Sequence, residues 1–197
     1  MIRVALLRHG HTAWNREGRI QGRTDMPLND AARAALRGLS LPPPWDRAQI
    51  VASPLLRARE TAELLSGRAP QIAHALTEMN WGTWEGRLRS DLHADPACDY
   101  RDVEDWGWDH TPPGGETPRA VRARVTAWAA TLREDTLAVC HIGVMRVLLA
   151  HAHGWDFDGP APFRVKRDRL YLLEGSGMTW RPAGEPLRLI EDAPCAR

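Results

Sequence analysis

Short apolar segments of strand length alternate with segments of helical character along much of this chain. Residues 2–7, 49–52 and 136–140 are short and mainly apolar, which predicts three buried strands. Helices are expected over residues 31–39, 53–66, 116–132 and 143–152. This alternation predicts an α/β fold, a three-layer sandwich whose mostly parallel central sheet has helices on both faces.

Capping residues indicate where the predicted helices begin and end. Ser53 is a good N-cap and Pro54 is tolerated in a first helical turn, so one helix is expected to begin at this pair. Gly67 is expected to end that helix, and Asn29 or Asp30 is expected to cap the preceding one. Further strand patterns follow at residues 70–74, 169–173 and 187–190.

Two segments lack a regular pattern. Residues 8–27 contain three glycines and are predicted to form a long functional loop with one helical turn. Residues 81–113 mix Gly, Pro and Trp and are predicted to form an irregular lid or insertion. The whole chain, residues 1–197, is expected to be a single domain, because this length suits one domain better than two.

The charge balance excludes proteins built mainly to bind polyanions. Lys and Arg total 26 and Asp and Glu total 25, whereas nucleic acid and acidic membranes require concentrated positive charge. No apolar run approaches the roughly 18 residues of a membrane span, and residues 4–7 are too few for a signal-peptide core. The three cysteines are scattered without a C-x-x-C spacing. We expect a cytoplasmic monomer or homodimer without nucleic-acid or membrane partners.

Three predicted elements bring histidine and arginine side chains to one edge of the sheet. The first strand continues into Arg8, His9 and Gly10, and the strand over 136–140 continues into His141. The helix after the strand over 49–52 carries Arg57 in its first turns. Because ligands gather beyond the carboxyl ends of parallel strands, these side chains are expected to share a site.

Two imidazoles and two guanidiniums suit a phosphoryl group, whose oxygens the fork of Arg binds bidentately. A neutral His9 can attack phosphorus and form a phosphohistidine, provided that a backbone carbonyl on its other nitrogen fixes the tautomer. A carboxylic acid must then protonate the leaving alkoxide. Glu78 is the candidate, because apolar neighbours favour the protonated form, and Glu85 is the alternative.

The run L-R-H-G-H-T-A-W-N at residues 7–15 resembles the opening motif of the histidine phosphatase superfamily, which includes phosphoglycerate mutases. Further blocks agree with this family in the same order, and together they cover residues 3–150. They lie at residues 21–28, 53–58, 78–86, 113–117 and 141–146. The resemblance implies phosphoryl transfer on a small phosphate ester without a metal ion or other cofactor.

The resemblance also implies roles for individual residues. His9 is the implied nucleophile, and Glu78 is the implied proton donor that later acts as the base activating water. His141 counts among the implied catalytic residues because it grips the phosphoryl oxygens beside His9. The other residues implied to bind those oxygens are Arg8, Asn15 and Arg57. The candidate substrate-binding residues are Gln21, Gly22 and Trp81.

The sequence departs from the family pattern after His141, where Ile142 stands in place of a common glycine or alanine and is expected to crowd the phosphate. The short chain resembles the small phosphatases of the family, including α-ribazole phosphatase. Acidic residues in the predicted lid would disfavour the trianionic phosphoglycerate if they face the pocket. These residues are Asp91, Asp95, Asp99, Asp102, Glu104 and Asp105.

We therefore predict a metal-independent phosphomonoester hydrolase that acts through a phosphohistidine on a small phosphorylated metabolite. A cofactor-dependent phosphoglycerate mutase is the alternative within the same chemistry, and a non-catalytic phospho-ligand binding protein is an alternative of another class. His9-x-His11 after a first strand also resembles the metal-binding pair of barrel hydrolases. Arg8 would repel a cation there, and the chain is short beside the roughly 250 residues of such a barrel.

Overall fold

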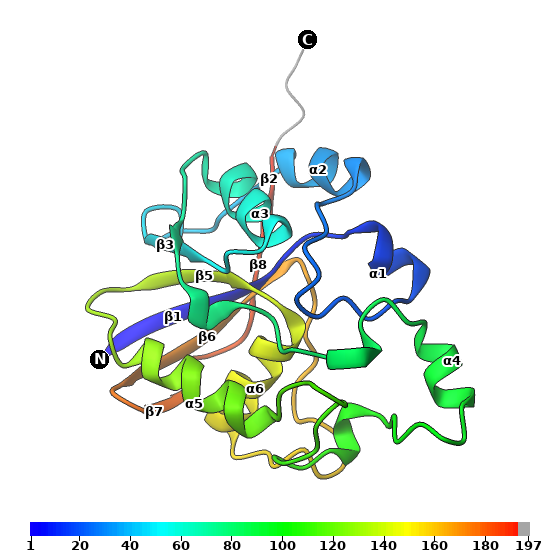
Figure 1. Cartoon of the computed structure of the whole chain (residues 1–197). Coiled ribbons are helices and arrows are strands. Elements are labelled where there is room, and N and C mark those ends of the chain that lie inside the picture. The colour runs from blue at the N-terminus through cyan, green and yellow to red at the C-terminus, as the bar shows by residue number, and fades with distance from the viewer. Residues whose placement is uncertain (193–197) are drawn as a thin grey trace.

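A computed structural model describes residues 1–192, and a central sheet organises them (Figure 1). One half of the sheet is parallel: β1 (Ile2–Arg8) pairs with β5 (Thr136–Cys140), and β5 pairs with β3 (Gln49–Ala52). The short β4 (Gln71–Ile72) adds to β3, where the sequence had predicted a longer strand over 70–74.

The other half of the sheet is antiparallel. β6 (Arg169–Ser176) pairs with β1, and both β7 (Thr179–Pro182) and β8 (Leu187–Arg188) pair with β6. A separate pair joins β2 (Leu39–Ser40) to β9 (Ile190–Glu191). The predicted α/β class is confirmed, with a sheet that is parallel on one side of β1 and antiparallel on the other.

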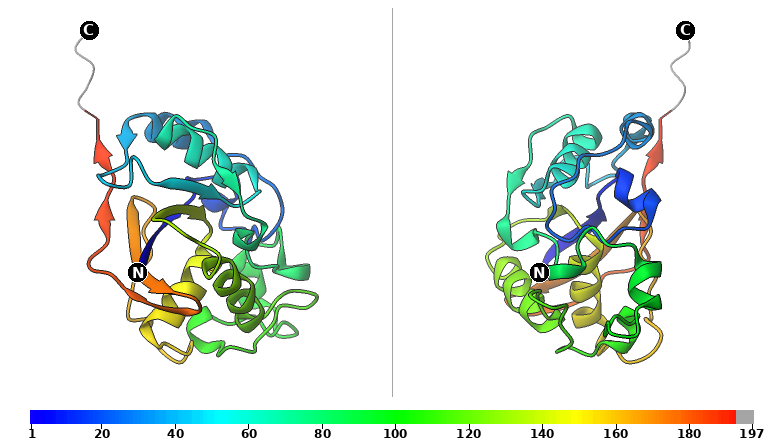
Figure 2. Two further views of the ribbon diagram at one scale, coloured as in Figure 1. Left: turned by 90° about the vertical axis from the view of Figure 1, so that its left-hand side faces the viewer. Right: turned by 45° about the vertical axis from the view of Figure 1, so that its right-hand side comes forward.

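Helices cover both faces of the sheet, as the two further views in Figure 2 also show. On one face, α2 (Asp30–Arg37) and α3 (Leu56–Ser66) pack on alternate residues of the strands, including Leu7. On the other face, α5 (Pro118–Ala129) and α6 (Ile142–His153) pack on the intervening residues. Because successive side chains of a strand point to opposite faces, this alternation produces the three layers.

The helix predicted to begin at Ser53 and Pro54 begins later than expected. The N-cap of α3 is Leu55, and its side chain makes no capping hydrogen bond. The hydroxyl of Ser53 instead lies 2.7 Å from Nε2 of His141, and it accepts a hydrogen bond from the Leu55 backbone at 3.3 Å. The cap prediction was therefore wrong because a tertiary partner takes the side chain.

The other helix ends follow local chemistry. Asn29 caps α2, where its Oδ1 accepts from the Ala32 backbone at 2.8 Å, as predicted. Thr117 caps α5, and Pro118 occupies its first position, so this helix is shorter than the predicted 116–132. The predicted turn in the loop after β1 is α1 (Ala13–Glu17).

The segment over residues 81–113 contains only short helical pieces, η2 (Gly82–Trp84), α4 (Arg89–Ala94) and η3 (Val103–Asp105). Aromatic rings within this segment pack on one another. The rings of Trp81 and Trp106 have centroids 5.1 Å apart, and Trp84 lies edge-on to Tyr100 at 5.1 Å. Trp84 and Trp106 therefore belong to the hydrophobic core.

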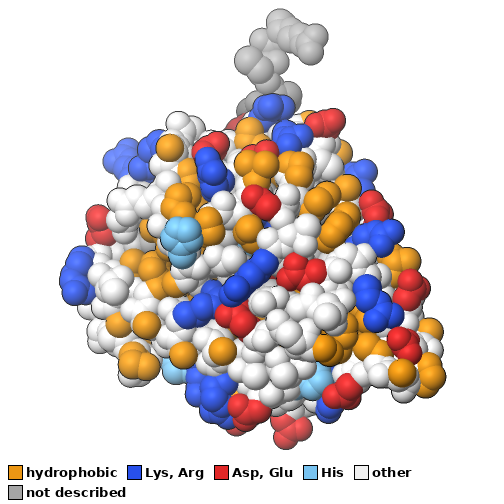
Figure 3. Space-filling model, in the orientation of Figure 1, with side chains coloured by type: hydrophobic (Ala, Val, Ile, Leu, Met, Phe, Trp, Pro, Cys, Tyr) orange, Lys and Arg blue, Asp and Glu red, His pale blue; other side chains and the backbone are white. Residues whose placement is uncertain are grey.

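Charged side chains of both signs are interspersed on the face shown in Figure 3. Among residues 1–192, no helix combines the length and apolar character that crossing a membrane requires.

We expect Trp84→Ala to lower the free energy of unfolding by about 3–5 kcal/mol, because it removes a large, 2% exposed side chain from the core. Urea denaturation followed by circular dichroism measures the change. Met178→Ala is the control, since Met178 is 64% exposed and its loss should have little effect. Equal stability of the two variants would contradict a structural role for Trp84.

Candidate functional site

Parallel pairing of β1 and β5 brings two histidines together at the carboxyl edge of the sheet. Arg8 and Cys140 are opposite each other in the register, so His9 and His141 leave the two strands side by side. The His9 backbone N–H donates to the Cys140 carbonyl at 3.0 Å, and the two imidazole centroids lie 5.1 Å apart. The predicted convergence of these residues is therefore present.

His9 is held as a neutral imidazole with one defined tautomer. Its Nδ1 lies 2.6 Å from the Gly10 carbonyl, which can only accept, so Nδ1 carries the proton and Nε2 does not. Burial lowers the pKa of His9 well below its ordinary value, and the positive charges of nearby residues, including Arg57 and Arg8, lower it further. Nε2 therefore keeps a free lone pair at neutral pH.

The guanidinium groups of Arg8 and Arg57 lie close to His9. Arg57 is fully buried, and its two terminal nitrogens donate to the carbonyls of Thr24 at 2.8 Å and Gly22 at 2.7 Å. Burial, together with the charge of Arg167, lowers the pKa of Arg8 to about 9, which leaves it protonated at neutral pH. The Nε atoms of Arg8 and Arg57 are buried without a hydrogen-bond partner among the described residues. Both groups thus retain donors for an anionic ligand.

His141 lies beside His9 and is fully buried. Its Nε2 meets the Ser53 hydroxyl, while its Nδ1 is buried without a partner in the part of the chain that the structure describes. Burial lowers the pKa of His141, as do the charges of Arg57 and Arg8. His141 is thus a second neutral imidazole with one nitrogen still available to a ligand.

Asn15 has two roles at the start of α1. Its Oδ1 accepts from the Thr12 backbone at 3.1 Å, and the Thr12 hydroxyl accepts from the Asn15 backbone at 3.3 Å. This reciprocal pair is a capping box, and it fixes the side-chain amide. The Nδ2 group remains as a donor beside His9.

Glu78 is buried and fixed by the backbone. Its Oε1 accepts from the Met79 N–H at 2.8 Å, and its Oε2 accepts from the Gly143 N–H at 3.1 Å. A Cβ at position 143 would lie 2.4 Å from Oε1, so only glycine leaves room for this carboxyl group. Each oxygen keeps a second lone pair that can carry a proton.

Glu85, the alternative acid, is engaged elsewhere. Its Oε1 accepts from the backbones of Arg23 at 2.8 Å and Trp81 at 3.2 Å. Its Oε2 accepts from the Thr24 backbone at 3.0 Å and from the Thr24 hydroxyl at 2.8 Å. Gly22, at φ +52°, packs so closely on Glu85 that a Cβ would lie 1.9 Å from Oε1. Glu85 therefore shapes the loop whose carbonyls hold Arg57.

These side chains line a cavity of about 40 Å³, which we call the His9 cavity. Of the residues predicted to form the site, only His141 is not part of its wall. Gln21, Gly22 and Trp81, the candidate substrate-binding residues, also line it. Its other lining residues are Arg8, His9, Asn15, Arg19, Ile20, Arg57, Glu78, Arg89 and Ile142.

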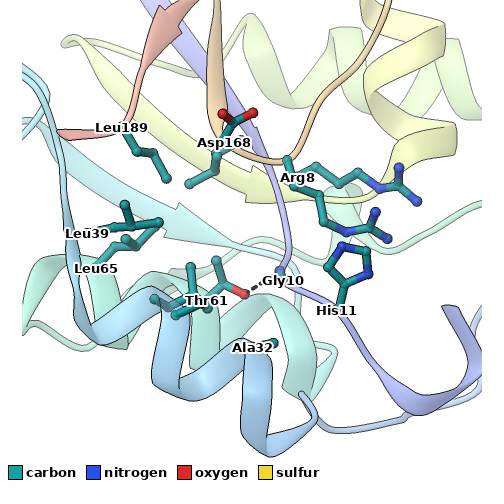
Figure 4. Close-up of a pocket in the computed structure, with 13 residues that line it drawn as sticks. Arg8, Gly10, His11, Ala32, Leu39, Thr61, Leu65, Asp168 and Leu189 are labelled. Atoms are coloured by element: carbon teal, nitrogen blue, oxygen red, sulfur yellow. Dashed lines mark hydrogen bonds between the residues drawn. The ribbon is translucent and has the colours of Figure 1, made fainter. Parts of the chain in front are cut away.

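A different cavity, of about 120 Å³, lies between the end of β1 and helices α2 and α3 (Figure 4). Leu39, Leu65 and Leu189 form one side of it, and Arg8 and His11 lie on the other. The wall is mainly apolar and shares only Arg8 with the His9 cavity. Because it contains neither His9 nor Glu78, it is not where the predicted chemistry would occur.

Sequence reasoning missed Arg167, which comes from the loop before β6. Arg167 is half-buried, and its charge contributes to lowering the pKa values of Arg8, His9 and His11. Burial also lowers its own pKa to about 10. No local pattern distinguishes it from the other basic residues at 164–169, so only the tertiary structure identifies it. The described residues contain no cluster of three or more His, Cys, Asp or Glu placed to bind a metal ion.

The depressed pKa values of His9 and His141 predict a pH-dependent stability. The unfolded chain protonates these rings near pH 6.5, whereas the folded protein does so only at lower pH. The unfolded state therefore binds more protons below about pH 6.5, and the free energy of unfolding falls as the pH drops through that window. Urea denaturation at pH 7.5 and 5.5, with histidine ring signals followed by NMR, measures both effects.

Two variants make the pH test specific. His9→Asn should reduce the pH dependence, and His74→Gln should leave it unchanged because His74 is exposed. Rings of His9 and His141 that titrate at the ordinary value would contradict the prediction.

Comparisons with known proteins agree with this geometry. The family model described as histidine phosphatase superfamily (branch 1) matches residues 4–184. An adenosylcobalamin/α-ribazole phosphatase of Salmonella typhimurium is 35% identical over 92% of this chain and 100% of its own. An acid phosphatase of Mycobacterium tuberculosis is 32% identical over 77% of this chain and 70% of its own. The crystal structure of a phosphoglycerate mutase from Thermus thermophilus superposes with a TM-score of 0.69 at 31% identity, covering 97% of this chain and 100% of that one. The chain belongs to the histidine phosphatase superfamily.

Proposed function

We propose that the protein hydrolyses phosphate monoesters of a small metabolite through a phosphohistidine on His9, without a metal ion. The observation that carries the proposal is the 2.6 Å contact between His9 Nδ1 and the Gly10 carbonyl, in a cavity also lined by Arg8, Arg57 and Glu78. It leaves Nε2 as the nucleophilic nitrogen, beside the positive charge that a phosphoryl dianion requires.

In the first step, His9 Nε2 attacks phosphorus and the ester P–O bond breaks. The leaving alkoxide takes a proton from Glu78. Arg8 and Arg57 neutralise the charge on the transferring oxygens, while Asn15 Nδ2 and His141 Nδ1 donate hydrogen bonds to them. The guanidinium groups supply the positive charge that a divalent cation supplies in other phosphoryl-transfer sites.

In the second step, water attacks the phosphohistidine, and the Glu78 carboxylate takes the proton that the water loses. The N–P bond breaks, and His9 returns to its neutral form with inorganic phosphate released. The same carboxyl group thus acts first as acid and then as base.

His9→Ala should lower turnover of p-nitrophenyl phosphate by a factor on the order of 10³ or more, because no other group can form the covalent intermediate. Denaturing wild type in alkaline detergent during turnover of labelled substrate should trap phosphate on His9, because the N–P bond survives base but not acid, and should trap none on the variant. A chelator should leave the rate unchanged. His74→Ala, an exposed histidine, is the control.

The same experiment separates the alternatives. Full turnover by His9→Ala would overturn the mechanism, and loss of activity with chelator would overturn the metal independence. Specific binding of phosphate esters without release or trapping would favour the non-catalytic binding protein. Isomerisation of 3-phosphoglycerate in the presence of 2,3-bisphosphoglycerate, without net phosphate release, would favour the mutase.

Glu78→Gln should slow hydrolysis of alkyl phosphates more than that of p-nitrophenyl phosphate. An alkoxide needs a proton to leave, whereas p-nitrophenolate leaves without one, and an acid of this kind contributes about 10²–10⁴-fold. The comparison is made on single-turnover rates of phosphoenzyme formation with glycerol 3-phosphate and p-nitrophenyl phosphate. Glu63→Gln, on the exposed side of α3, serves as control. If both esters slow equally, Glu78 is not the acid.

A further inference from the structure

A second cavity adjoins the His9 cavity and is much larger. Its volume is about 270 Å³, against about 40 Å³ for the His9 cavity. Arg8, Arg89 and Ile142 line both cavities, so the two are neighbours across these side chains. The small cavity suits a phosphoryl group alone, and the rest of an ester bound there must extend outward.

Arginine dominates the charge of the larger cavity, which we call the arginine cavity. Four of its nine lining residues are arginines, and Glu104 is its one acidic residue. The other acidic residues of the predicted lid are not part of its wall. The condition under which the lid would disfavour a highly anionic substrate, that its acidic residues face the pocket, is therefore met by Glu104 alone. The full lining is Arg8, Arg89, Glu104, Ile142, Arg146, Ala161, Phe163, Arg164 and Val165.

None of these four arginines has an ionic partner within residues 1–192. The side chains of Arg89, Arg146 and Arg164 make neither a hydrogen bond nor an ion pair with any described residue. Arg146, in the second turn of α6, is half-buried. Burial lowers the pKa of Arg146, the charge of Glu104 opposes this shift, and the charge of Arg89 adds to it. Like charges are thus held together in a concave, partly desolvated place, which is unfavourable in the free protein.

Two other half-buried arginines of this protein are paired with carboxylates. Arg124 pairs with Glu116 at 3.2 Å, and Arg33 pairs with Glu60 at 3.2 Å. Arg146 is also half-buried, and although Glu104 lines the same cavity and acts on its charge, the two side chains form no ion pair. The guanidinium of Arg146 is therefore free to accept a counter-charge from a ligand.

We propose that the arginine cavity binds a second anionic group of the substrate, a carboxylate or a phosphate, while the scissile phosphoryl group occupies the His9 cavity. The inference rests on the proposed function, because it takes the ester bound at His9 as its starting point. The planar fork of Arg146, with Arg164 and Arg89, matches either anion. Phe163 and Val165 provide an apolar wall for the carbon chain between the two anionic groups.

The test compares matched esters that differ by one carboxylate. Glycerol 3-phosphate is paired with 3-phosphoglycerate, and sorbitol 6-phosphate with 6-phosphogluconate. Wild type should prefer the carboxylated member of at least one pair by roughly tenfold in kcat/KM, the scale of one charge-assisted hydrogen bond. Arg146→Gln should remove most of that ratio, and Arg146→Lys should retain part of it. Added salt should reduce the ratio in wild type.

Two further variants keep the test decisive. Arg164→Gln, in an exposed position, should also lower the ratio even if Arg146→Gln fails to fold. Arg37→Gln removes an exposed positive charge at the end of α2, away from the cavity, and should leave the ratio unchanged. A wild type without preference in either pair, or a ratio unaffected by both cavity variants, would overturn the proposal.

The experiments distinguish failure of the proposed function from failure of the proposed subsite. If no ester is hydrolysed, the phosphatase proposal falls, and calorimetric titration with the four esters still tests the subsite. Tighter binding of the carboxylated members to wild type than to Arg164→Gln would sustain it, and equal binding would reject it. If p-nitrophenyl phosphate is hydrolysed with dependence on His9 while the ratio stays near one, only the subsite is rejected.

Discussion

The candidate site depends on one strand pairing. β1 and β5 are neighbours in the parallel half of the sheet, with Arg8 opposite Cys140. His9 and His141, the next residues of the two strands, therefore lie side by side at the carboxyl edge. The contact between the His9 backbone and the Cys140 carbonyl extends this pairing by one residue beyond the strand. β3 ends beside β5 and delivers Ser53 to His141. The rigid sheet thus sets the geometry that the loops complete.

Charge is the second constraint: burial lowers the pKa of both kinds of side chain, but it leaves the histidines neutral and the arginines charged. Burial and neighbouring cations keep His9 and His141 neutral, which a nucleophile requires. The same burial lowers the pKa of Arg8 only to about 9, so the guanidinium stays charged. A bound dianion would relieve the repulsion among the cations and stabilise the whole arrangement. Repulsion among the cations therefore makes the free site less favourable than the site with an anion bound.

Sequence patterns predicted those parts of the site that follow directly from a strand end. His9 and His141 stand at the ends of short apolar runs, and alternation with helices places those ends on one edge. Ser53 was misassigned as a helix cap, because capping and a tertiary bond to His141 compete for one hydroxyl. Arg146 and Arg167 lie on a helix turn and a loop, where no periodicity marks them. The basic lining of the neighbouring cavity depends on packing across elements distant in the sequence.

Asn15 uses both ends of one amide group for different purposes. Its oxygen closes the capping box of α1, and its nitrogen is left for the site. An aspartate at this position would still accept from the Thr12 backbone, yet it would place a negative charge where the phosphoryl oxygens are expected. A serine would lose the reach of the amide. The start of a five-residue helix and the amide donor that faces the cavity thus depend on a single side chain, so a substitution that alters one of them alters the other.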